Sequence, residues 1–196
     1  MGKAINGKRD QVTLATKFGM VRDPKNPTAR ELSGKPDYVL SSCVASLKRL
    51  DEEIIDVYYL HRVDPSTSIE DSVGAMAQLV KSGKIKTIGL SEVSTTTLRK
   101  AHTIHPITAV QSEYSLWSCE PENGMLEICK ELGIAFDLYS PLGRGFLTGQ
   151  IKKFDDLAID DWRRVSPVLW VRIFGRALYI VSKLDVFAKK KGCTSS

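Results

Sequence analysis

The sequence predicts an α/β fold built on a parallel β-sheet, and two patterns in it support that prediction. Five short apolar segments rich in β-branched residues are predicted strands, at residues 12–18, 54–60, 87–90, 108–111 and 134–138. Segments with helical periodicity lie between them, at residues 36–50, 68–82, 94–103 and 121–132. This alternation is typical of a parallel sheet covered by helices. An open doubly wound sheet and part of a (β/α)8 barrel both fit, and a complete barrel usually needs about 250 residues.

The ends of the predicted helices carry the residues that start and stop helices. Pro36 and Asp37 open the first helix, and Ser68 precedes the second with Asp71 three residues on, which resembles a capping box. Gly83 and Gly133 stand where helices are expected to stop. The residues that start and stop helices therefore agree with the helices predicted from the hydrophobic periodicity.

The last 46 residues differ from the strand–helix units in 1–150. Residues 152–165 are charged and are predicted to be loop with a short helix, and residues 168–191 are predicted to be one long helix. Apolar positions run nearly all round that helix, so part of it is expected to pack on another surface. We predict a single domain over 1–196, with barrel units in 1–150 and a loop and C-terminal helix in 151–196.

Composition excludes several classes of protein. Hydrophobic residues make up 42% and charged residues 26% of the chain, as in soluble globular proteins. No stretch approaches the roughly 18 apolar residues of a membrane helix, and the N-terminus has no apolar signal segment. The net charge of +5 comes with no basic stripe interleaved with aromatic residues, so nucleic acid is not an expected partner.

The cysteines and histidines give no metal-ligand spacing. The 4 cysteines form no C-x-x-C pair, and the 3 histidines are not spaced as ligands beside them. We therefore expect no metal, and free thiols in a reducing cytoplasm.

Polar residues follow each predicted strand, where ligand sites of parallel α/β folds gather. The first four strands are followed or ended by Lys17, by His61 and Arg62, by Ser91 and Glu92, and by Gln111 and Glu113. The fifth leads from Tyr139 into a glycine loop at residues 143–149, which either cradles a phosphate with Arg144 or is an ordinary flexible turn.

Five segments at these strand ends resemble the aldo-keto reductase family, and most of all its plant auxin-induced-protein or perakine-reductase-like branch. They read ATKFG (15–19), DVYYLHRVD (56–64), GKIKTIGLSE (83–92), QSEYSL (111–116) and YSPLGRGFLTG (139–149). The resemblance implies a (β/α)8 barrel that reduces an aldehyde or ketone to an alcohol with NADPH.

The resemblance also assigns roles. Lys17 matches the lysine that lowers the pKa of the family's proton-donating tyrosine, and His61 matches the histidine that orients and polarises the substrate carbonyl. Ser91 and Gln111 match positions that bind the nicotinamide carboxamide, and Tyr139 matches the aromatic residue that stacks on the ring. The remaining cofactor residues match the pyrophosphate loop: Ser140, Pro141, Leu142, Gly143, Arg144, Gly145 and Gly149.

The sequence departs from the family pattern at both ends. The family's aspartate and proton-donating tyrosine precede the lysine strand, and no residue before Lys17 matches them; Asp10 and Tyr38 fall in the wrong segments. We therefore expect a partial barrel of about five strands, without the first two and the last. Such a barrel exposes sheet edges that favour self-association. Its catalysis should be impaired, and the alternative is an inactive truncated homologue that binds nucleotide or a protein partner.

One residue of the fifth strand is unusual for the resemblance. Asp137 puts a carboxylate where the family strand is apolar. If it is buried without a partner, it should cost several kcal/mol or take up a proton.

Overall fold

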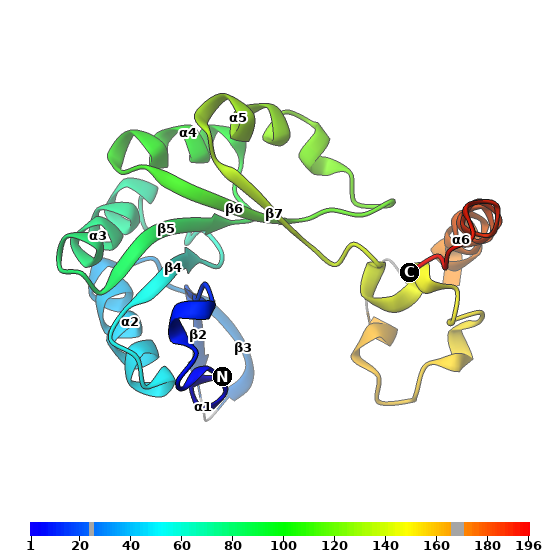
Figure 1. Cartoon of the computed structure of the whole chain (residues 1–196), viewed down its shortest axis with the longest axis horizontal. Coiled ribbons are helices and arrows are strands. Elements are labelled where there is room, and N and C mark those ends of the chain that lie inside the picture. Colours follow the sequence, from blue (N-terminus) through cyan, green and yellow to red (C-terminus); the bar gives the residue numbers. More distant parts are fainter. Residues whose placement is uncertain (24–25, 166–170) are drawn as a thin grey trace. The chain divides into compact units, whose positions relative to one another are not determined.

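The computed structural model describes residues 1–23, 26–165 and 171–196 (Figure 1). The described residues form two compact units. One comprises Met1–Glu113 with Glu120–Tyr139, and the other comprises Tyr114–Cys119 with Ser140–Ser196. The division of residues 1–196 at residue 150 within a single domain stays a prediction.

The first unit is built around a five-stranded parallel sheet, as the sequence predicts. Its strands lie side by side in chain order: β1 (Ala15–Phe18), β4 (Ile55–Leu60), β5 (Ile85–Ser91), β6 (Ile107–Glu113) and β7 (Ala135–Tyr139). A helix connects each strand to the next: α2 (Pro36–Leu50), α3 (Ile69–Lys81), α4 (Thr95–Ile104) and α5 (Met125–Leu132). These helices cover the outer face of the curved sheet (Figure 1). The arrangement is that of a partial (β/α)8 barrel.

The main core lies between this sheet and its helices. Tyr58 and Leu60 of β4 are completely buried, and the ring of Phe18 on β1 stacks on Tyr58 with centroids 4.8 Å apart. Each fully buried aliphatic side chain here contributes about 1.5–3 kcal/mol. The other large buried side chains of the cluster are Ile55, Val73, Met76, Ile85, Ile88, Leu90 and Leu98.

Local signals explain where several helices begin and end. The Ser68 hydroxyl accepts a hydrogen bond from the backbone N–H of Asp71 and donates one to its carboxylate, so this capping interaction starts α3. Ser94 caps α4 in the same way through the N–H of Thr97. Gly133 ends α5 in the left-handed conformation, as expected.

Helix α5 begins later than predicted. The sequence predicts a helix from residue 121, but Glu120–Glu122 form a separate 3-10 turn and α5 starts at Met125. Gly124 lies between them at φ +94°, and this left-handed residue interrupts the helix.

The chain also forms elements that the sequence analysis missed. Strands β2 (Met20–Asp23) and β3 (Asn26–Leu32) pair as an antiparallel hairpin. Residues 20–32 contain two prolines and no clear apolar alternation, so the hairpin has little local signal. Before the sheet lie a short helix α1 (Gly2–Ile5) and a 3-10 turn η1 (Arg9–Gln11).

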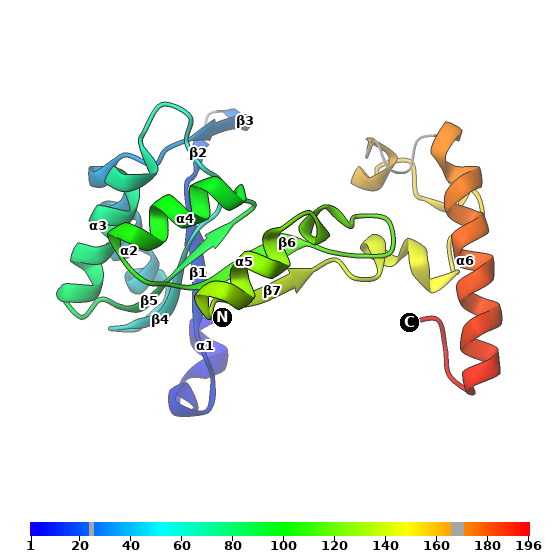
Figure 2. The same cartoon turned by 90° about the horizontal axis from the view of Figure 1, so that it is seen from above.

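The second unit has its own small core. It contains the 3-10 turns η3 (Gly143–Thr148), η4 (Phe154–Asp156) and η5 (Trp162–Val165), and the long helix α6 (Val171–Lys191), which Figure 2 shows as one continuous helix. Phe146 and Leu147 of η3 are buried with Val181 of α6. The predicted long helix is thus confirmed from residue 171, and its first three predicted residues lie outside the described ones. The surface on which α6 packs includes the η3 turn.

Within the described ranges, no helix is long and apolar enough to cross a membrane. No group of three or more histidine, cysteine, aspartate or glutamate side chains in the same ranges could hold a metal ion. Cys43 and Cys129 are buried free thiols, and Cys119 and Cys193 are exposed ones.

Candidate active site

The parallel register brings the predicted site residues of the first unit to one edge of the sheet. Lys17 on β1 is in register with Tyr59 on β4. His61 follows β4, and its backbone N–H donates a 2.8 Å hydrogen bond to the backbone carbonyl of Phe18. Ser91 at the end of β5 pairs with Gln111 on β6. Tyr139 ends β7 beside Glu113. Each of these positions lies toward the carboxyl end of its strand. Because the five-stranded sheet is entirely parallel, these ends lie along one edge of the sheet.

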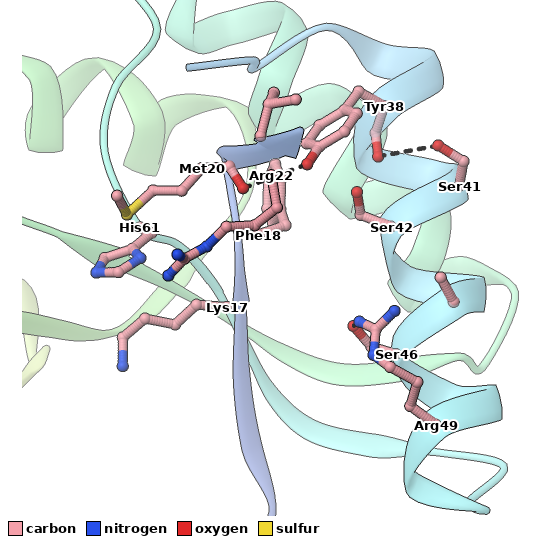
Figure 3. Close-up of a pocket in the computed structure, with 12 residues that line it drawn as sticks. Lys17, Phe18, Met20, Arg22, Tyr38, Ser41, Ser42, Ser46, Arg49 and His61 are labelled. Carbon is pink, nitrogen blue, oxygen red and sulfur yellow. Dashed lines mark hydrogen bonds between the residues drawn. The ribbon is translucent and has the colours of Figure 1, made fainter. Parts of the chain in front are cut away.

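Lys17 and His61 line the same cavity, which has a volume of about 590 Å³ (Figure 3). In Figure 3 the Lys17 and His61 side chains lie on one side of β1 and Ser41, Ser42 and Ser46 of α2 on the other, so the lining extends along both sides of the β1–β2 segment. Among the described residues, its lining includes the basic side chains of Lys17, Arg22 and Arg49 and no carboxylate, so it favours electron-rich groups. The described residues that line it are Lys17, Phe18, Met20, Val21, Arg22, Tyr38, Ser41, Ser42, Ala45, Ser46, Arg49 and His61.

The surroundings of His61 keep its imidazole neutral. Partial burial lowers the pKa of His61, and the positive charges of Arg62, Lys17 and Arg22 lower it further, while Glu92 opposes them. At neutral pH a neutral imidazole has one N–H donor. The neutral imidazole of His61 can therefore donate a hydrogen bond from this N–H to a carbonyl oxygen.

Ser91 and Tyr139 belong to a polar cluster around Arg62. The Arg62 guanidinium donates to the His61 carbonyl at 2.7 Å and to the hydroxyl of buried Ser91 at 3.4 Å. Burial, followed by a hydrogen bond to the Glu92 carboxylate, raises the pKa of Tyr139, and Arg62 opposes this shift. Tyr139 is therefore an uncharged, anchored ring and a poor proton donor at neutral pH.

Glu92 is fixed by the backbone. It adopts the left-handed conformation at φ +54°, and its carboxylate accepts a 2.9 Å hydrogen bond from the N–H of Glu113. A non-glycine residue at this φ is uncommon and costs free energy. The hydrogen bond joins the ends of β5 and β6 and so supports the positions of Ser91 and Gln111.

Asp137 is not buried without a partner, so the cost that such burial would carry does not arise. Asp137 is exposed on β7 and accepts a hydrogen bond from the side-chain amide of Gln111, with which it is in register. Strand β7 is the outer strand of the five-stranded sheet, so its side chains stay in contact with solvent. The carboxylate therefore orients the Gln111 amide instead of straining the sheet.

The predicted pyrophosphate loop, residues 140–149, lies in the second unit. Ser140, Gly143, Arg144, Gly145 and Gly149 all have positive φ, between +54° and +90°. The N–H groups of Gly143, Gly145 and Gly149 donate to carbonyls within the loop. Pro141 and Leu142 are exposed at its start.

Trp117 shapes this loop. A Cβ on Gly143 would lie only 2.0 Å from the indole atom Cζ2 of Trp117, so only glycine fits there. The Trp117 ring also contacts Phe146, with centroids 5.4 Å apart. Its Nε1 is a buried donor with no hydrogen-bond partner among the described residues. An unsatisfied buried donor against a left-handed glycine loop fits an anionic group such as a pyrophosphate.

Arg144, the cationic residue of the loop, lies against a second aromatic ring. Its guanidinium carbon is 5.5 Å from the ring centroid of Trp162, and its carbonyl accepts a hydrogen bond from Arg163. Arg163 is itself fixed by Asp161 through contacts of 2.6–3.0 Å. The loop is therefore supported from η5 within the same unit.

The sequence analysis does not predict the roles of three residues: Tyr59, Trp117, and Arg62, which donates hydrogen bonds to both His61 and Ser91. Tyr59 was assigned only to a buried strand, although its alternation with Tyr58 puts it on the opposite face of the sheet. Arg62 and Trp117 lie next to predicted motifs, but their contacts depend on pairing between distant segments. The structure brings together Lys17, His61, Ser91, Gln111 and Tyr139 in one unit, and the loop of 140–149 belongs to the other.

A parallel strand–helix sheet with a lysine, a histidine and amide and hydroxyl groups along its carboxyl edge has the arrangement of a (β/α)8 barrel, in which ligand sites lie at that edge. The chain belongs to the aldo/keto reductase family, whose model matches residues 1–196.

Individual relatives agree with this assignment. The chain is 46% identical over 191 residues to aldo-keto reductase str7 of Strobilurus tenacellus, covering 96% of this chain and 55% of that protein. Its fold matches the glycerol dehydrogenase AKR11B4 from Gluconobacter oxydans with a TM-score of 0.89 at 25% identity, covering 99% of this chain and 60% of the other. It also matches the holo form of aldo-keto reductase AKR11C1 from Bacillus halodurans, with a TM-score of 0.68 at 26% identity over 75% and 49% of the two chains. The chain thus spans between 49% and 60% of the length of these relatives.

Proposed function

We propose that this chain carries the carbonyl-binding and nicotinamide-binding part of an NADPH-dependent aldo-keto reductase, which reduces an aldehyde or ketone to an alcohol. The observation that carries the proposal is that Lys17 and His61 line one cavity at the carboxyl edge of a parallel sheet. Family membership supports it. A solved aldo/keto reductase from Klebsiella pneumoniae, 24% identical, is described in complex with NADP and acetate.

His61 and Lys17 would act on the carbonyl oxygen. The neutral imidazole of His61 donates a hydrogen bond to that oxygen, and the Lys17 ammonium adds a positive charge to the same cavity. Both interactions strengthen as negative charge develops on the oxygen, so they stabilise the transition state more than the ground state.

The residues that resemble cofactor-binding positions are Ser91, Gln111 and Tyr139 in the first unit and the loop of 140–149 in the second. Ser91 and Gln111 would hydrogen-bond the nicotinamide carboxamide, with Gln111 oriented by Asp137. Tyr139 would pack against the nicotinamide ring. Loop residues Ser140, Pro141, Leu142, Gly143, Arg144, Gly145 and Gly149 would bind the pyrophosphate. When bound, the cofactor supplies the hydride for the carbonyl carbon.

We further propose that turnover by these 196 residues alone is slow. None of their tyrosines matches the family's proton donor, and Tyr59 and Tyr139 both have raised pKa values. A positioned general acid contributes about 10²–10⁴-fold to the rate. A second candidate, binding of the nucleotide without catalysis, is favoured by the same observation.

Three narrower proposals accompany this function. The motif at residues 139–149 supports a place near the plant auxin-induced-protein and perakine-reductase-like branch. The outer strands β1 and β7 each have one neighbour in the five-stranded sheet, which supports self-association through sheet edges. The four free thiols support a reducing, cytoplasmic setting.

The test combines binding and turnover. NADPH is added to the purified chain and its nicotinamide fluorescence is followed, and then the loss of absorbance is measured with an aromatic aldehyde. We expect binding with slow turnover, and His61→Ala and Lys17→Met should abolish that turnover without abolishing binding. The matched controls are His105→Ala and Lys100→Met, which change residues on or next to α4. Binding with no turnover supports the second candidate. Equal rates for all four variants would disprove the roles assigned to Lys17 and His61.

A further inference from the structure

A row of side chains crosses the sheet from Lys17. Lys17 is in register with Tyr59, and Tyr59 is in register with Gly89. Gly89 continues to Ala109 and Ala109 to Ala135. Residues in register on adjacent strands point to the same face of a sheet. One large ring therefore lies in this row between a lysine and three small residues.

The absence of a side chain at residue 89 makes room for the Tyr59 ring. A Cβ on Gly89 would lie 2.4 Å from both Cδ1 and Cε1 of Tyr59, and 2.8 Å from its Cζ. The ring consequently lies over the Gly89 backbone, and Tyr59 is only 4% exposed. Burial, with a smaller contribution from Asp137, raises the pKa of Tyr59 to about 12. The phenol stays neutral, so Tyr59 offers its ring face and is no proton donor at neutral pH.

Lys17 lies against that ring face. Its Nζ is 5.5 Å from the Tyr59 ring centroid, within the range of a cation–π interaction. Within the described part of the chain, Lys17 makes no ion pair. A lysine side chain with four rotatable bonds has no fixed position in solvent unless some group holds it. The Tyr59 ring is the group that lies in contact with its charge.

We propose that Tyr59 is a positioning residue for Lys17: its ring, seated on Gly89, holds the Lys17 ammonium at the carboxyl edge of the sheet beside His61. The importance of this position for carbonyl reduction rests on the proposed function. The contact itself involves only described residues of the first unit, so it can be tested without cofactor or substrate.

His61 provides a reporter for the position of Lys17. The charged groups that act on its imidazole are Lys17, Arg62 and Arg22, which lower its pKa, and Glu92, which raises it. Lys17→Met should therefore raise the pKa of His61. A variant that releases the Lys17 ammonium into solvent should shift the His61 pKa in the same direction by part of that amount.

The experiment uses NMR on the full chain without NADPH. The lysines are labelled by reductive ¹³C-methylation, and the Lys17 signal is assigned by its loss in Lys17→Met. The ring current of Tyr59 should shift the Lys17 signal upfield. Tyr59→Phe keeps the ring and should keep both this shift and the His61 titration. Tyr59→Leu removes the ring, so the Lys17 signal should move to the position of lysines that have no neighbouring aromatic ring, and the His61 pKa should rise. The ring-proton chemical shifts of His102 and His105 at neutral pH should not change, which checks that the fold is intact.

A shape-matched series guards against misfolding of Tyr59→Leu. Tyr59→Phe is also made with fluorinated phenylalanine, which keeps the ring shape but withdraws electron density from its face. The Lys17 contact should weaken stepwise with fluorination, seen as a stepwise rise of the His61 pKa. If fluorination leaves this pKa unchanged, or if Lys17 shows no upfield shift in the parent chain, the proposal is overturned. Failure of NADPH binding, measured separately, would overturn the proposed function and leave these results standing.

Discussion

The Arg9 guanidinium lies 2.7 Å from Oδ2 of Asp56, and this contact joins the segment before the sheet to the start of strand β4. The same carboxylate accepts a 2.7 Å hydrogen bond from the N–H of Leu14 and pairs with Lys86 at 2.7 Å. Burial alone would disfavour the charged form, but the hydrogen bonds from Arg9, Lys86 and Leu14 hold the pKa of Asp56 well below its usual range.

Asp56→Asn should therefore destabilise the first unit. The amide leaves Arg9 and Lys86 without their common partner, and loss of one member of a buried pair costs about 2–4 kcal/mol. Urea unfolding followed by circular dichroism measures the change. The control is Glu131→Gln, which breaks the ion pair of Arg99 on the protein surface and should change stability little. Equal effects of the two substitutions would show that the Asp56 network has no special weight.

Stability should fall in acid below about pH 4. Burial opposes the ionisation of Asp56, but its hydrogen bonds lower its pKa all the same. Hydrogen bonds from Ser66 lower the pKa of Asp64, whose carboxylate also accepts hydrogen bonds from Gly34 and Thr67. A carboxyl group with a lowered folded-state pKa stabilises the fold above its unfolded-state pKa, and that stability is lost as pH falls toward the folded-state value. Unfolding curves from pH 7 to pH 2 should show this loss. Asp56→Asn should reduce the slope, and a slope unaffected by it would contradict the assignment.

Sequence patterns predicted the parts of this fold that depend on neighbouring residues. The cap at Ser68 and the stop at Gly133 depend on one turn of chain, and both are present. The start of α5 depends on the backbone angle of Gly124, which composition does not reveal. The β2–β3 hairpin is not predicted either, because it forms by pairing between two segments that show no clear strand pattern of their own.

The candidate site shows a similar division. The sequence points to Lys17 and His61 because each stands at or just after the end of an apolar strand, and the parallel topology then brings them to one cavity. The sequence leaves the exposure of Asp137 open, because this exposure depends on the place of β7 at an outer edge of the sheet. Tyr59 was overlooked as a site residue, because its contact with Lys17 follows from the register between β1 and β4.

Asp137→Ala should weaken NADPH binding and alter Tyr59. Without the carboxylate, the Gln111 amide loses its orienting partner, and loss of one hydrogen bond corresponds to about a 2–10-fold lower affinity. The Asp137 charge also contributes to the raised pKa of Tyr59, which should therefore fall. Fluorescence titration measures the affinity, and ultraviolet absorbance of phenolate measures the pKa. Tyr59→Phe identifies the tyrosine signal. An unchanged NADPH affinity would remove Gln111 from the binding site.

Gly143→Ala should damage the loop of 140–149 far more than Gly133→Ala damages α5. Both glycines have positive φ, +54° and +66°, so an alanine at either position incurs a left-handed backbone cost of about 1–2 kcal/mol. Nothing lies within 4 Å of a Cβ on Gly133, whereas a Cβ on Gly143 would clash with Trp117 at 2.0 Å. The Trp117 ring must then move, which adds about 1–3 kcal/mol and disrupts the predicted pyrophosphate site. Tryptophan fluorescence and NADPH titration should change for Gly143→Ala alone. If both variants bind NADPH like the parent chain, the loop does not hold the cofactor in the way proposed.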